Sequence, residues 1–147
     1  MGGLSGGWRV DFPHHDCDKL FALAVDIESY PRFLPWCRSA RIRHHDGNVL
    51  QVENRFGAGP LQINFRSRAV LDRPHSLEIT SSDGPFHSFA LTWRFEPLGT
   101  TGGRVVAQYR MELRSGLMQS LAHLSLGEIE RRVVRNFTER VRAVYGR

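Results

Sequence analysis

The sequence is poor in cysteine and almost free of lysine. Its two cysteines, Cys17 and Cys37, are too few for a disulfide framework and lack the spacing of zinc ligands. We therefore expect both thiols to be reduced and to act as small apolar side chains. Lys19 is the single lysine among 20 basic residues, so the positive charge is carried by arginine.

Long apolar runs are also missing. No stretch approaches the roughly 20 apolar residues that a membrane-spanning helix needs, and the N-terminus lacks the basic and then apolar pattern of a secretory signal. The glycine-rich residues 1–7 are predicted to form a flexible tail, followed by a single domain over residues 8–147. These absences favour a cytoplasmic protein that is at most peripheral to the inner membrane.

Recognisable catalytic and metal-binding motifs are absent. The sequence has no HExxH, CxxC, P-loop, GxGxxG or serine elbow. Four of its seven histidines form the adjacent pairs His14 with His15 and His44 with His45. Because neighbouring residues on a strand point to opposite faces, neither pair is placed to chelate one ion. We predict no metal site, no required cofactor and no catalytic residues.

The composition is that of one folded domain. The chain has 147 residues, of which 41% are hydrophobic and 24% are charged, which excludes a disordered protein. Its net charge of +5 suits a partner with phosphate groups, either ribosomal RNA or an anionic lipid surface, whereas we predict no DNA binding. The use of arginine throughout is equally explained by genome composition.

Apolar residues follow the period of strands over most of the chain. Trp8, Val10 and Phe12 alternate with polar residues and predict a first strand, and Asp16 is placed to cap a helix that ends near Ile27. A short second helix is expected over residues 28–34. About six strands in a meander follow, separated by turns at residues 46–48, 57–60, 73–74, 83–85 and 97–103.

The last thirty-odd residues change to the period of a helix. Apolar residues recur four apart at Ile129, Val133, Phe137 and Val141, while arginines occupy the opposite side. Gly127 lies inside this segment, and Ser125 with Glu128 forms a capping-box pattern, so we predict a kink or break near residue 126. An antiparallel sheet must twist and curl. The pattern therefore predicts an α+β fold in which a curved sheet of about seven strands wraps around one long C-terminal helix.

Two stretches resemble a known family. ALAVDIESYPRFLPWCRSARI, which begins at Ala22, and DGPFHSFALTWRFEPL, which begins at Asp83, are similar to the signature segments of the coenzyme Q-binding START-like family of the polyketide cyclase/START superfamily, including its bacterial RatA-type branch. The resemblance covers roughly residues 10–145. It implies the helix-grip fold (START/Bet v 1-like), with a hydrophobic cavity between the sheet and the C-terminal helix.

The resemblance implies three functions of different classes. The first is a carrier of a polyprenyl quinone such as ubiquinone, or of another lipid, which supports respiration and contacts a membrane or a respiratory complex. The second is a toxin-like inhibitor that acts on a ribosomal subunit and blocks subunit association. The third is a polyketide cyclase-like enzyme. We favour the carrier, because the inward-facing residues are apolar except for Asn54 and Tyr109, which leaves little for acid and base chemistry.

Candidate ligand-binding residues follow from the inward register of the strands and the final helix. Each aromatic residue taken alone is better explained by core packing, whereas the group as a whole favours a cavity, because the resemblance implies one. Asn54 is expected either to donate a hydrogen bond to a quinone carbonyl or to face a backbone group. The predicted set is Phe33, Trp36, Asn54, Phe56, Phe65, Phe86, Phe89, Trp93, Tyr109, Val133 and Phe137.

Overall fold

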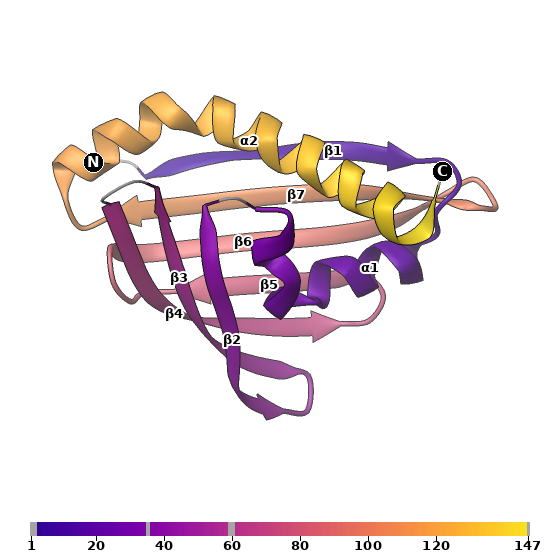
Figure 1. Cartoon of the computed structure of the whole chain (residues 1–147), viewed down its shortest axis with the longest axis horizontal. Helices are drawn as coiled ribbons and strands as arrows, with labels where there is room; N and C mark the ends of the chain where they lie inside the picture. Colours follow the sequence, from indigo (N-terminus) through magenta and orange to yellow (C-terminus); the bar gives the residue numbers. More distant parts are fainter. Residues whose placement is uncertain (1–2, 35, 59–60, 147) are drawn as a thin grey trace.

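Seven antiparallel strands form one curved sheet, and a long helix lies across its concave side (Figure 1). The computed structural model describes residues 3–34, 36–58 and 61–146. The strand order is β1-β7-β6-β5-β4-β3-β2, so every pair except β1 and β7 joins consecutive strands. This arrangement confirms the predicted α+β helix-grip fold. The strands are β1 (Leu4–Phe12), β2 (Cys37–Asp46), β3 (Val49–Ala58), β4 (Leu61–Asp72), β5 (Ser76–Ser81), β6 (Phe86–Leu98) and β7 (Gly102–Leu113).

The first strand begins earlier than the sequence predicted. β1 starts at Leu4, which lies opposite Met111 of β7, so residues 4–7 pair with β7 instead of belonging to a tail. Residues 1–2 lie outside the described residues. Gly7 suits this pairing, because a Cβ there would collide with the backbone carbonyl oxygen of Ala107. Glycine has no side chain to show an alternating pattern, so this part of the strand left no periodic signal.

Two short helices connect β1 to β2. Asp16 caps α1 (Cys17–Val25) as predicted, because its Oδ1 accepts a hydrogen bond from Lys19 N at 3.0 Å. The 3₁₀ helix η1 (Ile27–Arg32) contains Pro31 and takes the place of the expected second helix. Glu28 ties this helix to β2, since its Oε2 accepts a hydrogen bond from Ile42 N at 2.9 Å.

The turns agree with the predicted positions, with small shifts. Gly47 joins β2 to β3 with a φ of 60°, the left-handed conformation that glycine tolerates best. In the expected turn at 57–60, Gly57 belongs to β3, and residues 59–60 lie outside the described residues. The last turn is shorter than predicted, because β6 continues to Leu98 and β7 begins at Gly102.

The C-terminal helix α2 (Gly116–Tyr145) is unbroken, so of the predicted kink or break near residue 126, the break is wrong. Its N-terminus is capped by Ser115, whose hydroxyl accepts a hydrogen bond from Met118 N at 3.2 Å. Ser125 does not start a new helix: its hydroxyl donates to Leu121 O at 2.9 Å, and Glu128 pairs with Arg131 at 2.9 Å. A glycine inside a helix lowers the stability of the helix by about 1 kcal/mol. This cost is too small to interrupt a helix whose other side packs against the protein.

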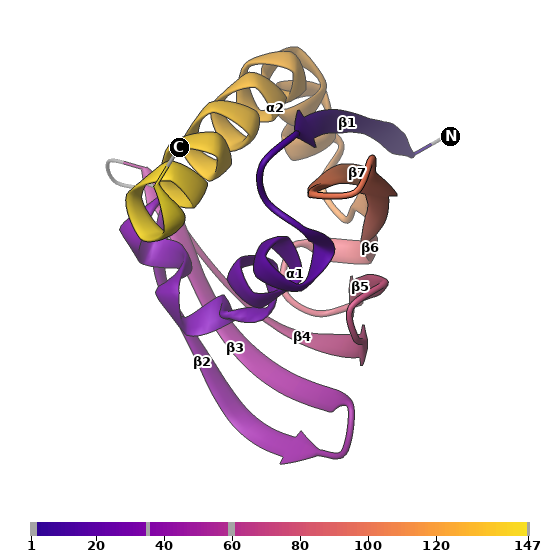
Figure 2. The same cartoon turned by 90° about the vertical axis from the view of Figure 1, so that its right-hand side faces the viewer.

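The two halves of α2 have different surroundings. In the C-terminal half, Val133, Phe137 and Val141 are buried against the sheet and α1. In the N-terminal half, Leu117, Leu121 and Leu124 are 72%, 55% and 81% exposed. Figure 2 shows α2 lying across the opening of the curved sheet, between the edge strands β1 and β2. No helix among the described residues has the length and apolar character needed to cross a membrane.

The solid part of the core lies beside α1. Phe137 is 1% exposed, and its ring centroid lies 5.3 Å from that of Trp93, 6.0 Å from that of Phe12 and 6.4 Å from that of Phe33. Both cysteines are free thiols, as predicted. Burial raises the pKa of the Cys37 thiol to about 11, so it stays protonated and is a poor nucleophile.

Candidate ligand-binding cavity

An apolar cavity of about 320 Å³ lies between the concave face of the sheet and α2. Leu126, Ile129 and Val133 of α2 form one wall, and side chains from β3 to β7 form the opposite wall. The aromatic rings of the solid core lie beside α1. Because α1 does not extend to the opposite end of the sheet, that end is not filled and forms the cavity. Its volume is at the lower end of the range for small-molecule sites, and its mostly apolar lining is typical of them.

Most of the residues predicted from the sequence surround this cavity. The eight that line it are Trp36, Asn54, Phe56, Phe65, Phe86, Phe89, Tyr109 and Val133. Phe33, Trp93 and Phe137 do not line it, which corrects the predicted set. Trp93 and Phe137 share the inward register but lie in the solid core described above, and Phe33, at the end of η1, packs against that core. A role for the eight residues in ligand binding stays a prediction.

A row of phenylalanine rings forms the wall from β3 to β6. The ring centroids of Phe56 and Phe65 are 5.5 Å apart and stacked, those of Phe65 and Phe86 are 4.9 Å apart, and those of Phe86 and Phe89 are 5.0 Å apart. Each ring touches the next, so the wall is continuous and presents aromatic surface to a ligand.

The sequence prediction missed several lining residues from the helices. Ile27, Tyr30 and Leu34 come from the segment between α1 and β2, and Leu126 and Glu130 come from α2. Helical spacing could have predicted Leu126 and Glu130, because positions 126, 130, 133 and 137 lie on one face of the helix. Glu130 is therefore a charged residue on the apolar face of its helix. The segment before β2 has no such periodicity.

Asn54 and Ser67 form a buried polar pair on the sheet wall. Asn54 is 7% exposed and Ser67 is 6% exposed. The Asn54 Nδ2 donates one hydrogen bond to Ser67 Oγ at 2.9 Å and one to Phe65 O at 3.2 Å. Both amide hydrogens are used, so the predicted donation from Asn54 to a quinone carbonyl is wrong for this arrangement. The amide faces a backbone group, which was the alternative expectation, and its Oδ1 makes no hydrogen bond to another described residue.

Tyr109 and Glu130 form a second polar pair, which joins β7 to α2. The Tyr109 hydroxyl donates a hydrogen bond to Glu130 Oε2. Burial, followed by the hydrogen bond to the Glu130 carboxylate, raises the pKa of the Tyr109 phenol. Gly6 of β1 lies against this pair, because a Cβ at Gly6 would lie 2.5 Å from Tyr109 Oη and 2.8 Å from its Cζ. The absence of a side chain at Gly6 thus leaves the room in which the phenol and the carboxylate meet.

The tyrosines give a prediction about alkaline pH. The pKa values of all three tyrosines, Tyr30, Tyr109 and Tyr145, are raised, with burial as the largest cause. Each phenol is thus harder to ionise in the folded protein than in the unfolded chain, where its pKa is about 10. The contribution of these groups to stability is complete below pH 10 and is lost as the pH rises further. Phenolate absorbance and circular dichroism, followed together with pH, are expected to change in one coincident transition above pH 10. Phenolate formation near pH 10 in a protein that keeps its circular dichroism would contradict this.

No metal centre is formed by the described residues. They contain no group of three or more histidine, cysteine, aspartate or glutamate side chains that could hold an ion. The adjacent histidines are separated: His15 is buried and its Nε2 lies 3.0 Å from Gly146 O, whereas His44 and His45 are exposed at the end of β2.

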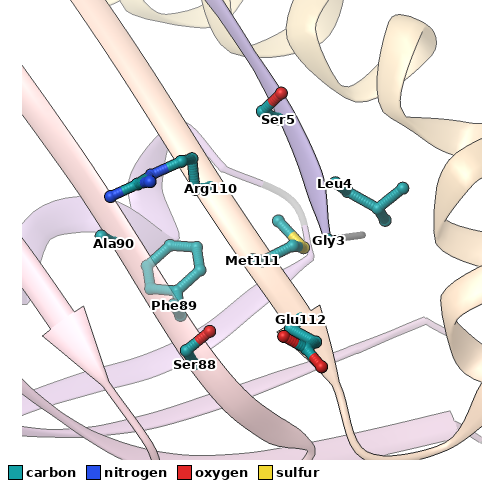
Figure 3. Close-up of a pocket in the computed structure, with 9 residues that line it drawn as sticks. All are labelled: Gly3, Leu4, Ser5, Ser88, Phe89, Ala90, Arg110, Met111 and Glu112. Carbon is teal, nitrogen blue, oxygen red and sulfur yellow. The ribbon is translucent and has the colours of Figure 1, made fainter. Parts of the chain in front are cut away.

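A second pocket, of about 370 Å³, lies beside β1, β6 and β7 (Figure 3). Phe89 and Met111 line both this pocket and the cavity, but here they are accompanied by Ser88 and Arg110, which are exposed. The pocket therefore mixes polar and apolar side chains at the solvent boundary. The cavity under α2 is the better candidate site, because it combines an apolar lining with the buried polar groups of Asn54 and Ser67.

Comparison with known proteins agrees with the fold. The ribosome association toxin RatA of Pseudomonas aeruginosa is 26% identical to the chain, over 86% of this chain and 88% of that protein. A START superfamily protein from Mycobacterium smegmatis superposes with a TM-score of 0.82 at 13% identity, over 97% of this chain and 99% of the other. An aromatase/cyclase from a Streptomyces species superposes with a TM-score of 0.76 at 14% identity, over 99% of both chains. At these identities the two structures show the fold alone.

The sequence model of one family covers most of the chain. The family is described as polyketide cyclase / dehydrase and lipid transport, and it matches residues 14–138. That range runs from the connection between β1 and α1 into the buried half of α2, so it contains most of the cavity. The chain therefore belongs to the polyketide cyclase / dehydrase and lipid transport family.

Proposed function

We propose that the protein binds a hydrophobic small molecule in the cavity under α2 and carries it without changing it chemically. The observation that carries this proposal is the apolar cavity between the sheet and α2. Each buried CH₂ group contributes roughly 0.8 kcal/mol, so a few prenyl units supply several kcal/mol without any directed contact. A polyprenyl quinone such as ubiquinone fits best, because its ring suits the aromatic wall and its tail suits the aliphatic side chains.

The cavity volume limits how much of such a ligand is enclosed. About 320 Å³ is small for a ligand site, so it holds the ring and the first part of a tail. The remainder of a long tail then lies outside the cavity. Leu121 and Leu124, exposed on α2 ahead of the cavity-lining Leu126, offer apolar surface for it.

Extraction tests this proposal directly. Organic extracts of gently purified protein, analysed by mass spectrometry, are expected to contain a quinone or another lipid in stoichiometric amount. Added decyl-substituted benzoquinone at roughly 100 times its Kd stabilises the folded state by about 2.7 kcal/mol, which raises the Tm by about 5–10 °C. Extracts without lipid, together with an unchanged Tm, would rule the carrier function out.

The absence of catalysis is part of the proposal, and the cavity supports it. The raised pKa of Tyr109 keeps its phenol protonated, so it is a hydrogen-bond donor and not a base at neutral pH. Asn54 and Ser67 are bonded to each other. Cyclisation of a polyketide by the purified protein, abolished by Tyr109→Phe with the fold intact, would contradict this part.

The second candidate function is inhibition of the association of ribosomal subunits. It is favoured by the similarity to RatA of P. aeruginosa over 86% of this chain. The exposed side of α2 carries Arg131, Arg132 and Arg135, a positive surface that suits ribosomal RNA. Overexpression is then expected to lower the ratio of assembled ribosomes to free subunits in sucrose gradients. An unchanged ratio would remove this candidate and leave the carrier.

A further inference from the structure

Two hydrogen-bond acceptors on residues that line the cavity have no partner among the described residues. On the sheet wall, the Oδ1 of Asn54 has no hydrogen-bond partner among the described residues, although the side chain is 7% exposed. On the helix wall, Glu130 accepts from Tyr109 through Oε2, and its Oε1 has no hydrogen-bond partner among the described residues. Both residues line the cavity. Glu130 is half-buried, so both acceptors face the cavity without a donor from the described residues.

The orientation of the Asn54 amide is fixed by its partners. Phe65 O can only accept a hydrogen bond, so the atom that faces it must be the Nδ2. The Oδ1 is thereby left as an acceptor. Between β7 and α2, Tyr109 uses its one hydroxyl hydrogen for Glu130, so it has no donor to offer a ligand.

We propose, resting on the proposed carrier function, that the cavity selects a hydroquinone over the corresponding quinone. A quinone ring presents only carbonyl oxygens, which accept hydrogen bonds and are repelled by the carboxylate of Glu130. A hydroquinone presents two hydroxyl groups on opposite sides of its ring, and each can donate. One hydroxyl then satisfies Glu130 on the helix wall and the other satisfies Asn54 on the sheet wall.

Hydrogen bonds to charged groups contribute about 1.5–3 kcal/mol, and each 1.4 kcal/mol is about tenfold in affinity. We therefore expect the hydroquinone to bind on the order of tenfold to a hundredfold more tightly than the quinone. Such a difference in affinity shifts the reduction potential of the bound quinone/hydroquinone couple. For a two-electron couple, about 30 mV corresponds to each tenfold difference, so the bound couple is more oxidising than the free one.

The test compares the two redox forms of one compound with the same tail. Decyl-substituted benzoquinone and its dithionite-reduced hydroquinone are titrated into the protein under anaerobic conditions, with heat as the readout. The hydroquinone is expected to bind at least tenfold more tightly. Glu130→Gln removes the charge and is expected to abolish most of this preference. Glu128→Gln is the matched control, because Glu128 lies on the same helix, is exposed and pairs with Arg131 and Arg132; it is expected to keep the preference.

A second variant guards against an effect of Glu130 on folding. Asn54→Leu removes the other acceptor, and it is expected to weaken hydroquinone binding more than quinone binding. The inference is overturned if the quinone binds as tightly as the hydroquinone. In that case the donors of the cavity, the Ser67 hydroxyl and the indoles of Trp8 and Trp36, govern recognition, and the carrier function stands. If neither form binds, both the inference and the carrier function fail.

Discussion

Replacement of Phe137 by alanine is expected to lower the free energy of unfolding by about 3–5 kcal/mol. The side chain is 1% exposed and packs against Phe12, Phe33 and Trp93. Removing the ring loses this buried apolar contact. It also leaves a space that the surrounding rings cannot fill, because they lie on three different parts of the chain. Urea unfolding followed by circular dichroism measures the loss.

The matched control for Phe137→Ala lies on the same helix. Val144 is 45% exposed, and Val144→Ala is expected to change the free energy of unfolding by about 0.5 kcal/mol or less. A loss below about 1 kcal/mol for Phe137→Ala would mean that the region beside α1 is loosely packed. The separation of a solid core from a hollow cavity would then be wrong.

Filling the cavity is expected to remove ligand binding without unfolding the protein. Ile79 lies on β5, in the centre of the sheet, and its side chain lines the cavity. In Ile79→Trp, the indole occupies space that is empty in the free protein, so it displaces the ligand and not packed atoms. Excluding even two CH₂ groups from burial costs about 1.6 kcal/mol, so affinity for the decyl-substituted hydroquinone falls roughly tenfold or more.

A tryptophan at the neighbouring position 78 is the control. It shows whether any tryptophan on β5 lowers ligand affinity or only one that fills the cavity. Glu78 is exposed, on the opposite face of the same strand, so Glu78→Trp is expected to leave affinity unchanged. Overpacking a filled core usually costs about 1–3 kcal/mol, whereas Ile79→Trp is expected to cost less because the space already exists. Titration calorimetry and urea unfolding of both variants measure the two effects. Unchanged ligand affinity in Ile79→Trp would place binding elsewhere.

Much of the fold could be predicted because its strands are half buried. Alternation of apolar and polar residues predicted most of the sheet, and the spacing of Val133, Phe137 and Val141 predicted the buried side of α2. The first residues of β1 could not be predicted, since glycine carries no pattern. The continuity of α2 was mispredicted, since a capping-box pattern is a local signal and packing along the whole helix outweighs it.

The cavity was only partly predictable, because inward register does not distinguish a lining residue from a core residue. Trp93 and Phe89 point to the same face of β6, yet Trp93 packs on Phe137 while Phe89 lines the cavity. The difference is position along the strand relative to α1, which depends on contacts between distant segments. Glu130 was the missed signal, because a carboxylate on the apolar face of a helix needs a buried partner.

The pairing of β1 with β7 determines when the cavity can form during synthesis. Leu4 lies opposite Met111 and Phe12 lies opposite Gly103, so the first strand has no partner until nearly all of the sheet has been translated. The hairpins from β2 to β6 join neighbours and can form early, whereas closing a loop of this length slows folding. The helix that covers the cavity is translated after the whole sheet. The cavity therefore cannot be completed before α2 has left the ribosome.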